Sequence, residues 1–200
     1  MEFARAVAEI ITESEIKKRA TGINTVVINN GVDFDKFQKS DIARPAILGN
    51  RTPIIFSVGA LKFRKGFHIS ISAVVKIKEL FPNFLYIISG DQSDEQYYAE
   101  LKNMVSRNHL ENNVVFVEAD DQKLVSIYKY ADLFLLTPVN QGNHFEGFGL
   151  VYLEAGACGV PSVGSKGCGA EDAIKDGQTG FLVEQNNIEK VSESILKIVQ

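Results

Sequence analysis

Between residues 53 and 200, short apolar runs alternate with segments that have the spacing of amphipathic helices, and this alternation leaves few folds open. The apolar runs occupy residues 53–59, 84–89, 113–117, 132–138, 160–164 and 180–183. The helical segments occupy residues 67–81, 95–108, 121–130, 150–158, 170–175 and 188–200, with Asp121 expected to cap the third. Runs that are apolar throughout are typical of strands buried on both faces. The pattern predicts an α/β fold, a doubly wound, mainly parallel, Rossmann-like sheet with helices on both faces.

In such a sheet a ligand binds beyond the carboxyl ends of the strands, so the segments that follow the strands are the places to search. The loop Ala60–Gly66 follows the first strand and is basic, with Lys62, Arg64 and Lys65. The turn His144–Glu154 follows the fourth strand and leads into a helix. We expect the binding site to be formed by these two segments.

The turn combines glycines, helix amides and carboxylates. Gly147 and Gly149 lack side chains, so a ligand can approach the backbone closely there. The first N–H groups of the following helix have no partner within it and can bind an anion such as a phosphate. Glu146 and Glu154 frame the site with oxygens that accept hydrogen bonds from hydroxyls. The combination suits a ligand that is half phosphate and half sugar, although a glycine-flanked turn with a nearby Glu also has a purely structural explanation.

The chain is expected to have three parts: the tail of a preceding unit at 1–22, an interdomain segment and linker at 23–52, and the Rossmann-like domain at 53–200. The smaller elements expected before residue 53 are a strand at 8–12, a helix at 14–20, a strand at 25–28, an Asn-Asn-Gly turn at 29–31 and an irregular polar loop at 34–51.

Composition excludes several classes of protein. The formal net charge of -4 argues against a nucleic-acid binder. The two cysteines, Cys158 and Cys168, are too few for a disulfide framework and belong to no metal-like cluster. No apolar run approaches the roughly 18 residues of a membrane-spanning helix, and the sequence has no signal-peptide pattern. We therefore expect a soluble, cytoplasmic domain.

Four segments resemble motifs of the retaining group 1 glycosyltransferases (glycosyltransferase family 4). They are Val27–Asp33 with Phe37, Ser57–Gly66, the Glu146 and Glu154 pair with Phe148-Gly149 between them, and Asp176–Val183. They stand in the order and at the spacings of that family. The chain therefore resembles the donor-binding domain, which is the C-terminal half of the two-domain GT-B architecture.

The resemblance implies roles for particular residues. Lys65 matches the lysine that pairs with the donor diphosphate. Glu146 matches the carboxylate near the reacting face of the transferred sugar and is the predicted catalytic residue. Glu154 matches the carboxylate that binds the nucleotide ribose. The predicted donor-binding residues are Lys65, Arg64, Gly147, Phe148, Gly149, Leu150 and Glu154, and no metal ligand is expected.

Two positions bear on how the donor is held. The family usually carries Arg directly after the glycine that ends the first strand, and this chain has Ala60 there. Arg64 or Lys62 could supply the missing cation from the same loop. By position, the backbone around Val117 and Glu118 is expected to line the pocket for the base, where the charge of Glu118 would bias the choice of base.

The resemblance implies retaining, metal-independent transfer of a sugar from a nucleoside diphosphate sugar to an acceptor hydroxyl, with no cofactor beyond the donor. The implied partners are the donor, a missing N-terminal domain and a saccharide or glycolipid acceptor. Membrane contact is expected only through that domain, and the fragment alone is expected to be inactive. The alternative is a module that binds a nucleotide or sugar nucleotide without catalysis. A nicotinamide-dependent dehydrogenase fits poorly, because the loop after Gly59 is not G-x-G-x-x-G.

Overall fold

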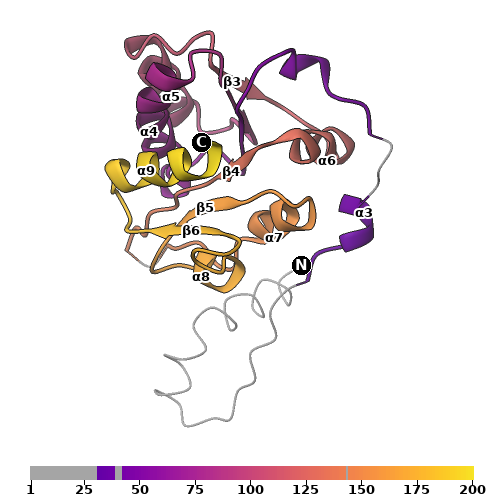
Figure 1. Ribbon diagram of the computed structural model, residues 1–200. Coiled ribbons are helices and arrows are strands. Elements are labelled where there is room, and N and C mark those ends of the chain that lie inside the picture. The colour runs from indigo at the N-terminus through magenta and orange to yellow at the C-terminus, as the bar shows by residue number, and fades with distance from the viewer. Residues whose placement is uncertain (1–30, 39–41, 143) are drawn as a thin grey trace.

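Six strands pair side by side, all in parallel, in the order β3-β2-β1-β4-β5-β6 (Figure 1). The computed structural model describes residues 31–38, 42–142 and 144–200. The strands are β1 (Ile54–Val58), β2 (Leu85–Ser89), β3 (Val114–Val117), β4 (Leu133–Leu135), β5 (Ser162–Ser165) and β6 (Gly180–Val183). This is the strand order of a Rossmann fold, and the doubly wound prediction is confirmed.

The strand order reverses between β1 and β4, which are neighbours in the sheet although β2 and β3 separate them along the chain. Val58 pairs with Ser89, and Ser89 pairs with Val117, so β1, β2 and β3 end at the same edge. The loops that follow β1 and β4 leave this edge from adjacent strands and lead to opposite faces. A crevice at such a reversal is where doubly wound sheets bind ligands.

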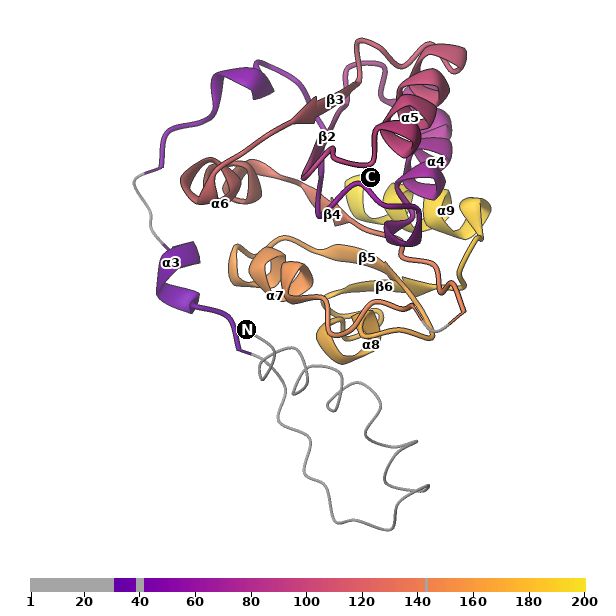
Figure 2. The same ribbon diagram turned by 180° about the vertical axis from the view of Figure 1, so that it is seen from behind.

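Helices cover both faces of the sheet (Figures 1 and 2). One face carries α4 (Phe67–Leu80), α5 (Glu95–Arg107) and α9 (Ile188–Val199), with α9 packed against α4. The opposite face carries α6 (Asp121–Tyr130) and α7 (Leu150–Ala157), and α8 (Ala170–Ala173) packs beside α7 and β5. None of the helices in the described ranges is long and apolar enough to cross a membrane.

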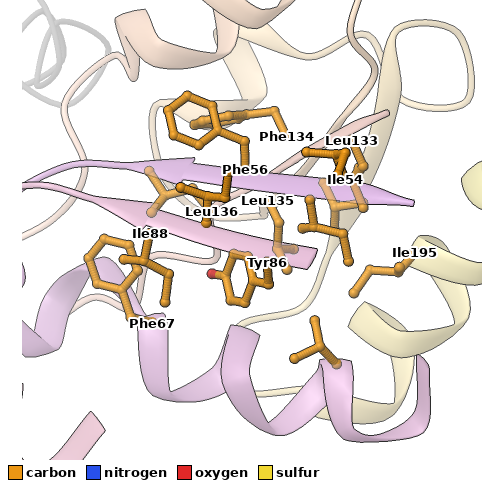
Figure 3. Packing of buried hydrophobic residues seen from close by; sticks show 14 of the residues in the cluster. Ile54, Phe56, Phe67, Tyr86, Ile88, Leu133, Phe134, Leu135, Leu136 and Ile195 are labelled. Atoms are coloured by element: carbon orange, nitrogen blue, oxygen red, sulfur yellow. The ribbon is translucent and has the colours of Figure 1, made fainter. Parts of the chain in front are cut away.

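The core has one apolar layer on each side of the sheet. Figure 3 shows Phe56 and Phe134 on one side of the central strands, and Tyr86 and Phe67 on the side of α4. All four side chains are fully buried. Full burial of a large apolar side chain stabilises a fold by about 1.5–3 kcal/mol. The two layers hold β1, β2 and β4 rigidly and so fix where their loops begin.

A short helix, α3 (Phe34–Gln38), lies in the segment that was expected to be irregular, so that prediction was wrong. Phe37 is buried with its ring centroid 5.9 Å from that of Tyr128. The side chain of Gln38 donates to the carbonyl of Ala157, and Lys36 Nζ lies 2.8 Å from Asp121 Oδ2. These contacts fix α3 against α6 and α7, and nothing in the local polar sequence predicts them. A 3-10 turn, Ala46–Leu48, follows in the same segment.

The residue that caps α6 is Asp120, not Asp121 as predicted. Asp120 Oδ1 accepts a hydrogen bond from the backbone N–H of Lys123 at 2.8 Å. A capping side chain reaches that N–H from the position just before the first helical residue, and Asp121 is already helical. The strands expected at 8–12 and 25–28, the helix at 14–20 and the turn beginning at residue 29 lie outside the described residues.

Candidate functional site

The loops after β1 and β4 are joined by backbone contacts. Gly66 immediately precedes α4 and has φ +71°, and a Cβ on this residue would lie 1.8 Å from the carbonyl oxygen of Thr137. Val139 N–H donates to the carbonyl of Arg64 at 2.8 Å. Thr137 Oγ1 donates to the carbonyl of Gly66 at 3.1 Å. The loop after β1 therefore lies directly on the loop after β4, which explains why a glycine is required at position 66.

Two cations converge on one carboxylate at this junction. Lys65 Nζ lies 2.6 Å from Glu146 Oε2, and Arg64 NH1 lies 3.3 Å from the same oxygen. Glu146 is only 8% exposed, and the Lys65 side chain is 13% exposed. Burying a charged carboxylate is costly unless cations pair with it, and Lys65 and Arg64 are such partners. Since two positive charges face one negative charge, the cluster keeps an excess positive charge that can bind an anion.

Unpaired amides lie next to this cluster. Among the described residues, the backbone N–H groups of Gly147, Phe148, Gly149 and Leu150 have no hydrogen-bond acceptor. Gly149 has φ +71° and precedes the first residue of α7, so these groups belong to the helix entry. The N-terminal end of a helix favours negative charge. Amides and cations at one place make a site suited to phosphate oxygens.

The close approach of a third loop fixes the turn. Gly169 N–H donates to the carbonyl of Glu146 at 2.9 Å. A Cβ on Gly169 would lie 1.9 Å from the carbonyl oxygen of Gly147. The segment after β5 thus contacts the backbone of Glu146 and Gly147 directly. These contacts would hold the N–H groups of residues 147–150 in place when a ligand binds.

Glu154 lies on α7 and is bonded to a tyrosine of α6, not to the cations that pair with Glu146. Its Oε2 accepts a hydrogen bond from the hydroxyl of Tyr128 at 3.0 Å. No donor in the described ranges bonds to its other oxygen, Oε1. Glu154 is half-buried. The sequence offered no signal for Tyr128, because a tyrosine in an amphipathic helix is ordinarily a core residue.

A hollow of about 290 Å³ opens at the carboxyl ends of β1, β2 and β3. Its lining includes Ala60, Ser89, Gly90, Asp91, Glu118 and Leu124. Ligand pockets usually measure about 300–1,000 Å³, so this hollow has room for a base-sized group and little more. Glu118 is part of this lining and Val117 is not, while the role of the hollow as a pocket for the base stays a prediction. Asp91 was missed, although the rule about strand ends applies equally to the loop after β2.

The two candidate replacements for the missing arginine occupy different places. Arg64 approaches Glu146, as described above. Lys62 is exposed and is near Asp91, whose pKa is lowered first by hydrogen bonds from Ser93 and further by the charge of Lys62. Arg64, and not Lys62, is therefore the cation that shares the cluster with Lys65.

An aromatic group supports the basic loop. The ring of Phe63 stacks on His68 at a centroid distance of 4.3 Å and an angle of 24°. The Nδ1 of His68 and the hydroxyl of Tyr97 lie 2.8 Å apart. Burial lowers the pKa of His68, so the neutral ring is favoured. These contacts join the 3-10 turn Phe63–Lys65 to the first turn of α4 and to α5.

The described ranges contain no group of three or more His, Cys, Asp or Glu side chains that could hold a metal ion. Cys158 and Cys168 are free thiols. Burial raises the pKa of both, that of Cys168 to about 11, so each keeps its proton at neutral pH.

Comparison with known proteins assigns most of the chain to one family. The sequence model of the family described as "Glycosyl transferases group 1" matches residues 38–200. The chain is 31% identical, over 82% of its length, to the GDP-mannose-dependent alpha-(1-6)-phosphatidylinositol monomannoside mannosyltransferase of Mycolicibacterium smegmatis, and covers 44% of that protein. It is 27% identical, over 96% of its length, to the capsular polysaccharide biosynthesis glycosyltransferase CapM of Staphylococcus aureus, and covers 49% of it.

A solved structure resembles the fold closely. The structure of HepE from Anabaena in complex with UDP-glucose superposes with a TM-score of 0.75 and is 27% identical in sequence. The match covers 88% of this chain and 48% of HepE. The chain therefore spans about half the length of the relatives it matches.

Proposed function

The chain belongs to the group 1 glycosyltransferase family, and we propose that residues 53–200 are the donor-binding domain of a retaining enzyme. In this proposal the enzyme transfers a sugar from a nucleoside diphosphate sugar to an acceptor hydroxyl. The observation that carries the proposal is the convergence of Lys65 and Arg64 on Glu146 beside the free amides of residues 147–150. The kinship with HepE, whose structure contains UDP-glucose, supports the same class of ligand.

The diphosphate would bind by replacing Glu146 as the partner of Lys65 and Arg64. Lys65 and Arg64 each have donors that now bond to a single carboxylate oxygen. Phosphate oxygens carry more charge and offer more acceptors than that oxygen, and a guanidinium can bind two of them at once. Arg64 would then serve in place of the arginine that Ala60 replaces. The free N–H groups at the start of α7 would bond to the remaining phosphate oxygens.

Glu146 would act on the sugar. When the cations turn to the diphosphate, its carboxylate is left next to the phosphate-bound end of the sugar, where it can accept hydrogen bonds from hydroxyls and stabilise positive charge at the reacting carbon. Glu154, which lies just over one helical turn after the start of α7, would bind the ribose hydroxyls. The hollow lined by Glu118 would receive the base.

We further propose that the departing diphosphate is stabilised by Lys65, Arg64 and the helix amides, with no metal ion and no cofactor beyond the donor. Retention would follow if the leaving phosphate oxygen accepts the proton of the incoming hydroxyl on the same face of the sugar. The acceptor, a saccharide or glycolipid, would bind to an N-terminal domain outside this sequence. That domain is proposed because the chain spans about half the length of its relatives. The chain alone would then bind donor and transfer little.

The second candidate function is that of a module that binds a nucleotide or sugar nucleotide without catalysis. Ala60 favours it, since this position lines the hollow and holds no cation. Sugar transfer by a protein that combines this chain with an N-terminal half would decide against it.

The proposed function is tested by calorimetric titration of the chain with UDP, GDP, ADP and NAD. We expect one nucleoside diphosphate to bind and NAD not to bind. A Glu154→Ala variant should bind that nucleotide roughly tenfold or more weakly, because a hydrogen bond to a charged group contributes about 1.5–3 kcal/mol. The matched control is Glu189→Ala, which removes a surface carboxylate paired with Lys76. Absence of binding by all three diphosphates, or binding of NAD alone, would contradict the proposal.

A further inference from the structure

The hydroxyl of Tyr128 is bonded to a carboxylate that the proposed mechanism uses. Tyr128 lies on α6 and Glu154 on α7, the two helices on the same face of the sheet (Figure 2). The hydroxyl donates to Glu154 Oε2 at 3.0 Å, and the carbonyl of Val151 lies 3.3 Å from the same hydroxyl. One group thus contacts both the functional side chain and the backbone of its helix.

The ring that carries this hydroxyl is held on several sides. Its centroid lies 4.8 Å from that of Phe56 and 5.9 Å from that of Phe37, both edge-on. The ring of Phe134 lies 5.6 Å away in a tilted orientation. Tyr128 is fully buried, so its ring cannot turn without disturbing β1, β4 and α3. The position of the hydroxyl is therefore set by the core and not by the ligand.

The hydroxyl also stays protonated. Burial raises the pKa of Tyr128 well above its usual value, and the nearby charge of Glu154 raises it further. The group is therefore a permanent donor, and Glu154 Oε2 is its closest acceptor. The Nζ of Lys36 is paired with Asp121 and not with Glu154.

We propose that Tyr128 is a positioning residue that holds Glu154 by one oxygen and leaves the other to the ribose hydroxyls, and so sets the preference for ribonucleoside over deoxyribonucleoside diphosphates. This inference rests on the proposed function, in which Glu154 binds ribose. A carboxylate fixed by one oxygen has fewer rotamers to lose when the ligand binds. Without the hydroxyl, Glu154 samples other rotamers and distinguishes ribose from deoxyribose less well.

The test compares UDP and GDP with dUDP and dGDP by titration of the full chain and its Tyr128→Phe variant. The change keeps the buried ring and removes only the hydroxyl. We expect the ratio of ribonucleotide to deoxyribonucleotide affinity to fall by roughly fivefold, the effect of one hydrogen bond. A purely structural role would weaken both ligands equally and leave the ratio unchanged. The matched control is Tyr130→Phe on the same helix, where the lost hydroxyl bonds to the carbonyl of Ile42.

The double variant Tyr128→Phe with Glu154→Ala tests the role of Tyr128 separately from the proposed role of Glu154 in binding ribose. If Tyr128 acts through Glu154, adding Tyr128→Phe to Glu154→Ala lowers the ratio of ribonucleotide to deoxyribonucleotide affinity no further than Glu154→Ala alone. If Glu154→Ala lowers the ratio and Tyr128→Phe leaves it as it is or raises it, the inference is overturned and the proposed function stands. If no nucleoside diphosphate binds to the wild-type chain, both are overturned.

Discussion

Lys65 Nζ lies 2.6 Å from Glu146 Oε2, across the point where the strand order reverses between β1 and β4. The pair joins the loops after β1 and β4, which leave this point for opposite faces of the sheet. In the proposed function this contact is one that the ligand must open, because the lysine would turn to the diphosphate and the glutamate to the sugar. Several consequences of the geometry can be measured.

Removing the charge of Glu146 should strengthen nucleotide binding while it weakens transfer. Glu146→Gln frees Lys65 and Arg64 from their carboxylate, so a diphosphate no longer competes with it. We expect affinity for the bound nucleoside diphosphate to rise by roughly two- to tenfold, as for one or two hydrogen bonds. Sugar transfer by a two-domain enzyme should fall by roughly a hundredfold or more. Calorimetry and a transfer assay measure the two effects.

The control for that experiment is Glu189→Gln, which breaks the surface pair with Lys76. It should change neither binding nor transfer. Weaker nucleotide binding in Glu146→Gln, with transfer near the wild-type rate, would contradict the assignment of Glu146.

Gly66→Ala should separate the two loops of the site. A Cβ there would lie 1.8 Å from the carbonyl oxygen of Thr137, at a residue with φ +71°. We expect the free energy of unfolding to fall by about 3 kcal/mol or more, because an unfavourable φ and a steric clash add. Gly177→Ala is the matched control, since Gly177 has φ +73° and nothing within 4 Å of the added Cβ. It should cost about 1 kcal/mol. Equal losses in guanidinium unfolding would show that the contact between the loops does not matter.

The sequence predicted much of this architecture, because the information it needed was local. Apolar runs and helical spacing identify the strands from β1 to β6 and the helices between them. The parallel pattern then indicates that the loops after β1 and β4 begin at the same edge of the sheet. The proximity of Lys65 to Glu146 follows from that rule together with the family resemblance.

Other features depend on contacts between distant residues, and local pattern does not reveal them. The helix α3 forms in a polar segment because Phe37 reaches the buried ring of Tyr128. The bond from Tyr128 to Glu154 spans 26 positions and two helices. Arg64 lies within the 3-10 turn Phe63–Lys65, whereas Lys62 precedes it. The two side chains therefore take different directions, which their charge alone does not predict.

The corrected cap of α6 can be checked by two neighbouring substitutions. Asp120→Ala removes the acceptor for the N–H of Lys123 and should lower the free energy of unfolding by about 1 kcal/mol. Asp121→Ala removes an exposed pair with Lys36 and should cost less, about 0.5 kcal/mol. Thermal or guanidinium unfolding of the two variants gives the comparison. A larger loss for Asp121→Ala would support the cap first expected from the sequence.

His68 should make the stability of the fold depend on pH in the acid range. Burial lowers the pKa of His68 below the usual value of about 6.5, against a smaller opposing effect of Glu100. As pH falls through 6.5, the unfolded chain takes up the proton before the folded one, so stability is full above this value and is lost below it. A His68→Gln variant should show a shallower fall in the free energy of unfolding between about pH 7 and pH 5. The free energy of unfolding is measured with urea at several pH values in that range. If it falls as steeply with pH in His68→Gln as in the wild-type chain, the role of His68 is refuted.

The most direct test of the central claim asks whether the junction of β1 and β4 recognises a diphosphate. UDP, GDP and ADP, with UMP, GMP and AMP, are titrated against the wild-type chain, Lys65→Ala and the control Lys76→Ala, whose lysine pairs with Glu189 on the surface. We expect the wild-type chain and Lys76→Ala to prefer the diphosphate by roughly tenfold, the contribution of one charged contact, and Lys65→Ala to lose this preference. A preference that persists in Lys65→Ala, or no nucleotide binding by the wild-type chain, would contradict the central claim.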